Sequence, residues 1–525
     1  MKTRSSYAAE ESLARFNAWL ADRRVEIDPA IEMRACGPEA GVSGGRPHYA
    51  VYANENREEG TVVARIPKEA CLTALTTGIA STLQEFECGG ALALVMAVMY
   101  ERDVRKEDSP WRGYFEILPQ REHLPVYFSR AELAELEGTE LHASVAQDRE
   151  FMTQDYEEVV RPFFAHVMAD SGSPPPSRAS FFDAASLVAS RAFRVDDEHG
   201  DGMVPLADMF NHRTDGETIR IYGDEEAQED DALIVAGGCA GACKGGCTAS
   251  CEVAVTRARR REALDSLAII AVQPLRAGDE VFNTFGTHGN AALLHKYGFC
   301  ELDNKHGIVC LPAALVSDCV RGGEPAFIAA AEALGLSEAL ADDADAFFQI
   351  GPEGEGVLGD MAREGPLRAV AAWCCLEEEP ARRAVLAKAF TQGGEGGEDG
   401  EDGGGATMGA VESLLGVLEA RLALYPEDAS SAEEQAHLAW GSGAKGQAPA
   451  GGGFAGAAAA CVLRVTEKRV LEGAFLALVD ELRSARRAME KGSKGKGKQG
   501  GEERPAKRTR VVSGACYDAR VVINR

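Results

Sequence analysis

Three polar residues that could do chemistry stand inside an apolar run, VPLADMFNHR, which extends from Val204 to Arg213. They are Asp208, Asn211 and His212, at intervals of three and one. The run is too polar for a core strand and too apolar for an ordinary surface loop. Asn and His in a loop often cap a turn or satisfy a buried carbonyl. The residue types alone therefore leave a structural role open beside a functional one.

Further candidates are Arg191 in the motif SRAF, and Phe285 and Tyr297 in the stretch EVFNTFGTHGNAALLHKYGF. Arg191 could bind an anion, although on the sequence alone a surface salt bridge is the simpler interpretation. Tyr297 could serve a reaction through its hydroxyl or could be a core aromatic whose hydroxyl reaches water. The sequence shows no clear Ser/His/Asp arrangement and no phosphate-binding P-loop, so nothing in it points to a covalent enzyme intermediate.

The elements that must position these residues are short. The pieces HYAVYA and TVVARIP are strand-like and separated by turn residues, which predicts a small hairpin-type sheet. SGSPPPS, at Ser171 to Ser177, is a breaker between helical patterns. We predict helices over Glu11 to Leu20, Gly90 to about Arg102 and Phe181 to Phe193, and a strand, a turn and a second strand over Ser266 to Gly286.

From about Ala313 the apolar residues recur at three- and four-residue spacing, which is typical of helices. Two segments, 393–406 and 441–456, are too poor in large apolar residues to fold. We therefore predict an α+β unit over 9–312, with a helical insertion over about 90–190 and a Cys/Gly-rich insertion over about 215–264. An α-helical domain over 313–490 and a basic, disordered tail over 491–525 follow.

The overall composition limits the classes of protein to which the chain could belong. The 525 residues are 45% hydrophobic and carry a formal net charge of -28, with a pI near 4.9. This charge argues against direct nucleic-acid binding and favours a basic partner. No run of 18 apolar residues and no signal-peptide core is found, and 14 cysteines are scattered along the chain. We expect no membrane contact, reduced thiols, and a location in the nucleus or cytoplasm.

One cysteine array has regular spacing: Cys239, Cys243, Cys247 and Cys251. Four thiolates could bind zinc, but structural zinc sites use closer pairs that are separated by a longer loop. We favour a flexible or redox-sensitive insertion and predict no metal site.

Three motifs occur in a fixed order: SRAF, then VPLADMFNH, then DEVFNTFGTHGNAALLHKYGF. With RIP at Arg65 to Pro67, DSPWRGYFEILP at Asp108 to Pro119 and LEGTELH at Leu136 to His142, they resemble the Rubisco large-subunit methyltransferase branch of SET-domain protein lysine methyltransferases. The resemblance covers roughly Ala9 to Pro312. It implies a knot-like core of small β-sheets, S-adenosyl-L-methionine as cofactor and a lysine-containing protein as substrate, with the helical half corresponding to the family's substrate-binding domain.

The resemblance also implies roles for individual residues. Cofactor contacts fall to Arg191, Asn211, His212 and Tyr297, and to Pro47, His48 and Tyr49, where the family's Gly-rich loop belongs. Asp208, Arg191, Trp111 and Phe285 fall on the substrate side. For Trp111 a core position explains the residue equally well.

Phe285 departs from the family pattern, which places a tyrosine before this glycine as the catalytic hydroxyl. Losing one well-placed polar contact can cost about 10²–10³ in rate. Two interpretations follow. Either Tyr297 or an altered pocket replaces the hydroxyl in an active lysine methyltransferase, or the chain is a pseudo-enzyme that binds cofactor or peptide without methyl transfer. Transfer to histidine, which occurs in the same branch, is a further alternative.

Overall fold

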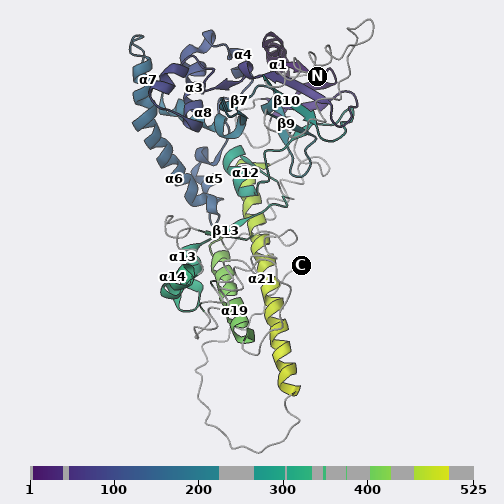
Figure 1. The fold of residues 1–525 in the computed structure, drawn as a ribbon, viewed down its shortest axis with the longest axis vertical. Coiled ribbons are helices and arrows are strands. Elements are labelled where there is room, and N and C mark those ends of the chain that lie inside the picture. Colours follow the sequence, from purple (N-terminus) through teal and green to yellow (C-terminus); the bar gives the residue numbers. More distant parts are fainter. Residues whose placement is uncertain are drawn as a thin grey trace, which may run out of the picture.

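The computed structural model describes residues 4–38, 47–223, 265–301, 304–333, 347–350, 370, 374, 403–426 and 454–495. In Figure 1 the N-terminal half forms a broad head of short strands and helices, and α21 (Gly456–Gly495) runs away from it along the long axis. Helices and strands share the head, which confirms the predicted α+β class. Within the described ranges, no helix is both long and apolar enough to cross a membrane.

A four-stranded antiparallel sheet lies in the head, with the strand order β1-β4-β10-β9. Every second residue of β10 is buried, because successive side chains of a strand point to opposite faces. This sheet packs against the main hydrophobic core. Its strands are β1 (Glu26–Ile27), β4 (Val62–Pro67), β9 (Ile219–Tyr222) and β10 (Ser266–Ala271).

The predicted hairpin between HYAVYA and TVVARIP is wrong. The first piece is β3 (Pro47–Ala53), which pairs with β2 (Ile31–Pro38) in a separate antiparallel sheet. The second piece is β4, whose two neighbours are β1 and β10. Alternation of apolar residues identifies a strand but not its partner. Here the partner of β4 comes from about two hundred residues further along the chain.

A three-stranded sheet contains the strands that precede and follow the helical region, in the order β5-β7-β6. β5 (Leu72–Thr73) and β6 (Ala192–Asp196) both pair antiparallel with β7 (Gly200–Met203). Gly202 is needed in β7, because a Cβ atom there would lie 2.8 Å from Cγ2 of Thr73. β6 follows directly on α8 and so fixes where that helix ends.

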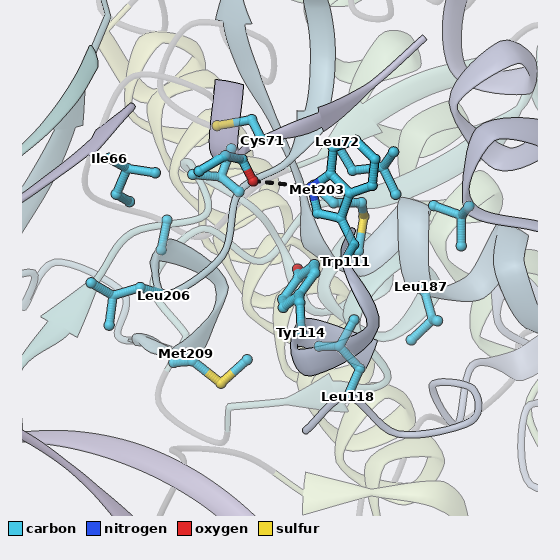
Figure 2. Packing of buried hydrophobic residues seen from close by; sticks show 14 of the residues in the cluster. Ile66, Cys71, Leu72, Trp111, Tyr114, Leu118, Leu187, Met203, Leu206 and Met209 are labelled. Atoms are coloured by element: carbon cyan, nitrogen blue, oxygen red, sulfur yellow. Dashed lines mark hydrogen bonds between the residues drawn. The ribbon is translucent and has the colours of Figure 1, made fainter. Parts of the chain in front are cut away.

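The helical region between β5 and β6 supplies much of the core. Ser177 begins α8 by accepting a hydrogen bond from the backbone N–H of Ser180, so the predicted breaker is also a helix cap. Figure 2 shows Trp111 and Tyr114 among the buried side chains of this core. The helices are α2 (Ala80–Glu85), α3 (Gly90–Met99), α4 (Arg112–Phe115), α5 (Arg130–Ala134), α6 (Glu140–Asp155), α7 (Arg161–Val167) and α8 (Arg178–Arg191); α1 (Arg4–Asp22) precedes them.

The C-terminal part is mostly helical in its described residues and has a hydrophobic core of its own. Its strands join distant segments: β12 pairs with β15, and β13 with β14. The elements are β12 (Phe299–Cys300), β13 (Val309–Pro312), α13 (Ala313–Cys319), α14 (Gly323–Ala333), β14 (Phe347–Ile350), α19 (Gly403–Leu422) and β15 (Phe454–Ala455).

Three predictions of unfolded segments are wrong at their edges. Residues 403–406 belong to α19, residues 454–456 belong to β15 and α21, and residues 491–495 belong to α21. Long helices continued into glycine-rich sequence explain two of these errors, since neighbouring turns can propagate a helix through poor helix formers. The array Cys239, Cys243, Cys247 and Cys251 lies outside the described residues.

Candidate active site

The segment from Val204 to His212 turns sharply at Leu206, whose φ is +74°. A bulky residue seldom adopts a positive φ, and such strain persists only where the surrounding structure fixes it. Leu206 is completely buried, so packing holds the turn in place. One 3-10 turn, η6 (Ala207–Met209), follows and presents Asp208.

Asn211 and His212 form β8, which pairs in parallel with β11 (Phe282–Asn283). The side chain of Asn211 donates from Nδ2 to Oε1 of Glu280 at 2.5 Å. Burial raises the pKa of Glu280, while this hydrogen bond opposes the rise. The Asn side chain therefore ties together two segments that lie 69 residues apart in the sequence.

His212 is 1% exposed and links β8 to the residue that departs from the family pattern. The backbone N–H of Phe285 donates to Nδ1 of His212 at 3.0 Å. Burial lowers the pKa of His212 to about 4, so the ring is neutral at pH 7. Because Nδ1 accepts, Nε2 carries the proton and donates it to Oγ1 of Thr214 at 3.0 Å.

Four aromatic rings lie around this point. His212 stacks on Phe285 with ring centroids 5.0 Å apart, and Phe285 lies 4.6 Å from Tyr297. Phe299 packs against all three. The segments that end at His212 and at Tyr297 therefore converge. Burial raises the pKa of Tyr297, whose hydroxyl makes no hydrogen bond to another described residue.

The end of α12 (Asn290–Tyr297) sets the position of Tyr297. Gly298 follows in the left-handed conformation, with φ +81°, as is usual for the residue after a helix. The hydroxyl of Ser190 donates to the carbonyl of Lys296 at 2.6 Å. This bond attaches the end of α12 to the end of α8, one residue before Arg191.

Arg191 has two carboxylate partners and is not a surface salt bridge. Its Nε donates to Oε1 of Glu122 at 2.6 Å, and its Nη1 to Oδ2 of Asp208 at 3.2 Å. Nη1 also donates to the carbonyl of Asp208 at 3.0 Å. Burial alone would lower the pKa of Arg191, but the charges of Glu122 and Asp208 raise it. The guanidinium therefore stays charged.

The carboxylate of Asp208 is completely buried, and both its donors use the same oxygen. The hydroxyl of Tyr114 donates to Oδ2 at 2.8 Å, beside the bond from Arg191. Oδ1 is buried and has no hydrogen-bond partner among the described residues. Burial raises the pKa of Asp208 to about 6, while Arg191 and Tyr114 favour the charged form. The carboxylate faces protein groups rather than an open entrance.

The remaining residues named from the sequence belong to other elements. Pro47 and His48 begin β3, and Tyr49 follows in the same strand, half-buried. Trp111 is 4% exposed and donates from Nε1 to the carbonyl of Ala70 at 3.1 Å, in the core. Of the two positions considered for Trp111, the structure shows the core position, because the indole N–H finds its acceptor there.

Three residues at this site were not identified from the sequence: Tyr114, Glu122 and Glu280. Tyr114 lies in the aromatic connector DSPWRGYFEILP, which could have drawn attention to it. The bonds of Glu122 and Glu280 join residues that lie 69 positions apart, and no local pattern signals them.

Comparison with known proteins gives relatives that match a little over half of the chain. No family model matches. The N-lysine methyltransferase SETD6 of Mus musculus is 26% identical over 310 residues, which are 55% of this chain and 54% of that protein. The Danio rerio setd6 is 25% identical over 323 residues, 57% of this chain and 59% of that one. The chain thus spans little more than half the length of these relatives.

Solved structures match a larger share of the chain. The SET domain of LSMT bound to lysine and AdoHcy superposes with a TM-score of 0.59 at 18% identity, over 91% of this chain and 93% of that one. Rubisco LSMT bound to AdoMet gives 0.57 at 19% identity, over 93% and 97%. This chain has the SET-domain fold of these solved structures. In the SET-domain head, the parallel β8–β11 pair is where the motifs VPLADMFNH and DEVFNTFG of the sequence meet.

Proposed function

We propose that this chain is a protein-lysine N-methyltransferase that uses S-adenosyl-L-methionine. The observation that carries the proposal is the convergence of the segments ending at His212 and Tyr297 around Phe285. The relatives named N-lysine methyltransferase and the SET-domain neighbour bound to lysine and AdoHcy support it.

The residues present fit an amino-acid sulfonium cofactor. Nη2 of Arg191 makes no hydrogen bond to another described residue, and the side chain is 20% exposed, so it can bind a carboxylate. The rings of Phe285, Tyr297 and Phe299 offer faces that attract a cation. Asn211 and His212 would contact the cofactor largely through their backbone, as would Pro47, His48 and Tyr49 in β3.

The cofactor supplies an electrophilic methyl group when it is bound. The chain has to present an uncharged lysine nitrogen in line with it, although free lysine has a pKa of about 10.4. Half-buried aromatic rings and the buried, neutral His212 lower the polarity of the site, which disfavours the ammonium form. Holding the reacting atoms in line can supply several kcal/mol of the rate enhancement.

We assign the positioning hydroxyl to Tyr297. Phe285 offers a ring without a hydroxyl, and the ring of Tyr297 lies 4.6 Å from it. No hydrogen bond to a described residue occupies the Tyr297 hydroxyl, which is thus available to a substrate amine. Its raised pKa keeps it protonated at neutral pH, so it can donate to or accept from that amine.

The substrate we propose is a protein whose lysine lies in a basic segment, since the chain carries a net charge of -28. The head over 9–312 would hold the cofactor, and the helical part over 313–490 would bind the substrate protein. A location in the nucleus or cytoplasm, with no direct binding of nucleic acid, belongs to the same proposal. Asp208 would act on the substrate side through Arg191, and Trp111 would contribute only through the core.

The test joins calorimetry of S-adenosylmethionine binding with transfer of a labelled methyl group to proteins of a lysate. We expect Tyr297→Phe to bind the cofactor as the native protein does and to lose about 10²-fold in transfer. We expect Phe285→Tyr to increase transfer. Phe151→Tyr is the matched control, because Phe151 is 54% exposed on α6. Absence of cofactor binding in the native protein would refute the proposal.

A second candidate is a non-catalytic peptide-binding protein, and Phe285 is the observation that favours it. Binding of cofactor without any transfer by the native protein, with transfer gained in Phe285→Tyr, would establish this second function. A third outcome is transfer to histidine instead of lysine, which acid hydrolysis and identification of the methylated amino acid would distinguish.

A further inference from the structure

The charge around Arg191 is unbalanced. One guanidinium lies between the carboxylates of Glu122 and Asp208, so the group as a whole carries one excess negative charge. A ligand carboxylate that binds to Nη2 of Arg191 therefore meets two like charges beside the one that attracts it. Like charges at such distances oppose binding.

The two carboxylates are held very differently. The side chain of Asp208 is completely buried and receives bonds from both Arg191 and the buried Tyr114. The side chain of Glu122 is 19% exposed. It lies on the connector between α4 and η4 (Pro125–Tyr127), where its own backbone N–H donates to Oγ of Ser186 at 3.0 Å. Asp208 is thus a fixed part of the site, and Glu122 is the carboxylate that can move away.

The same connector also approaches the end of α12. A Cβ atom at Gly298 would lie 2.9 Å from the carbonyl oxygen of His123, the residue after Glu122. The connector therefore contacts both the guanidinium of Arg191 and the end of α12 that carries Tyr297. A ligand that reaches both groups has Glu122 as a neighbour.

We propose that Glu122 competes with the carboxylate of the cofactor for Arg191 and so lowers the affinity of the chain for S-adenosylmethionine. This inference rests on the function proposed above. Glu122 acts as an internal anion that neutralises Arg191 in the ligand-free protein. Cofactor binding requires that its side chain leave Nε of Arg191 or tolerate a second carboxylate beside it.

The experiment compares two ligands by calorimetry: S-adenosylmethionine and decarboxylated S-adenosylmethionine, which lacks the competing group. Glu122→Gln keeps an oxygen that can accept from Arg191 but removes the charge. Removing one like charge at a partly exposed site should tighten S-adenosylmethionine binding about fivefold to tenfold. Binding of the decarboxylated ligand should not tighten, because that ligand has no carboxylate for Glu122 to repel. Glu116→Gln is the matched control, since Glu116 forms its salt bridges with Arg15 and Arg112 instead.

The outcomes separate this inference from the proposed function. If the native protein binds neither ligand, the proposed function fails. If it binds both ligands but Glu122→Gln binds S-adenosylmethionine equally or more weakly, Glu122 supports Arg191 instead of competing, and the inference is overturned. An equal gain for both ligands also overturns it, because the effect would not involve the carboxylate. Glu122→Ser repeats the test without an amide if Glu122→Gln melts at a lower temperature than the native protein.

Discussion

Glu467 gives a prediction whose magnitude follows from a buried cluster between the two parts of the chain. Its side chain is 2% exposed and lies in α21. The hydroxyl of Tyr425 donates to Oε2 at 2.5 Å, and Nη2 of Arg421 donates to the same oxygen at 3.2 Å. Oε1 is buried, as is Oε2 of Glu140 in α6, and neither atom has a hydrogen-bond partner in the part of the chain that the structure describes. The buried guanidinium of Arg421 thus pairs with Glu467.

Burial raises the pKa of Glu467 to about 8. Arg421 and Tyr425 oppose this rise, and the charge of Glu140 adds to it. The ordinary value is 4.5, so between pH 4.5 and 8 the folded protein holds a proton that the unfolded chain has lost. Stability from this group is therefore complete below pH 4.5 and is lost as the pH rises through 8.

The size of the effect follows from 1.36 kcal/mol for each unit of difference in pKa. Between pH 6 and pH 8, titration of Glu467 should lower the free energy of unfolding by about 2 kcal/mol. Glu467→Gln keeps the shape of the protonated acid and cannot ionise. Between pH 6 and pH 8, we expect the free energy of unfolding of this variant to fall by about 2 kcal/mol less than that of the native protein.

The assay is urea unfolding at pH 6, 7 and 8, monitored by circular dichroism. Glu472→Gln is the control, because Glu472 is exposed on the same helix and the substitution is identical. This variant should keep the pH dependence of the native protein. Equal pH dependence in Glu467→Gln and the native protein would refute the reasoning, since it would mean that Glu467 is ionised at pH 6 in the folded state.

Three further predictions concern stability and can be measured by urea unfolding. Gly298→Ala should cost about 2 kcal/mol and reduce methyl transfer, because φ is +81° and the new Cβ would lie 2.9 Å from the carbonyl oxygen of His123; an unchanged protein would contradict this. Phe210→Ala should cost about 3–5 kcal/mol, since Phe210 is 1% exposed in the core, and a loss below 1 kcal/mol would show that the core closes around it. Asp28→Asn should cost about 1–3 kcal/mol at pH 7 and less as the pH falls below 4, because the hydrogen bonds from Arg57 lower the pKa of Asp28; a constant cost from pH 7 to 3 would refute the pairing.

Local pattern predicted the elements well where one face of an element is buried. The run from Gly90 and the stretch from Phe181 are helical, and Ser266 begins a strand that alternates between buried and partly exposed residues. These periods report which side of an element faces the core. The prediction failed at the glycine-rich residues 403–406. Composition does not show whether a long neighbouring helix extends into such a segment.

The sequence pattern could not predict which distant segments of the chain contact one another. The sequence TVVARIP has the same pattern of apolar residues whether it pairs with the next strand or with one about two hundred residues away. The bond from Tyr114 to Asp208 joins residues 94 positions apart. Only the ordered motifs of a known fold could bring such segments together from the sequence. That resemblance led to the convergence of His212 and Tyr297, but not to the connector with Glu122.

The connector and the aromatic cluster bear on one question, which is how a SET-domain head without the expected tyrosine could still transfer a methyl group. Replacing that tyrosine by Phe285 removes a hydroxyl but leaves the ring, and the ring still stacks on His212 and Tyr297. The geometry that aligns a nucleophile therefore persists, while one polar contact is missing. A neutral His212, fixed by the backbone N–H of Phe285, cannot supply that contact, because both its nitrogens are engaged. Tyr297 is the group in this cluster whose hydroxyl is free of hydrogen bonds to described residues, and activity in the native protein should depend on it.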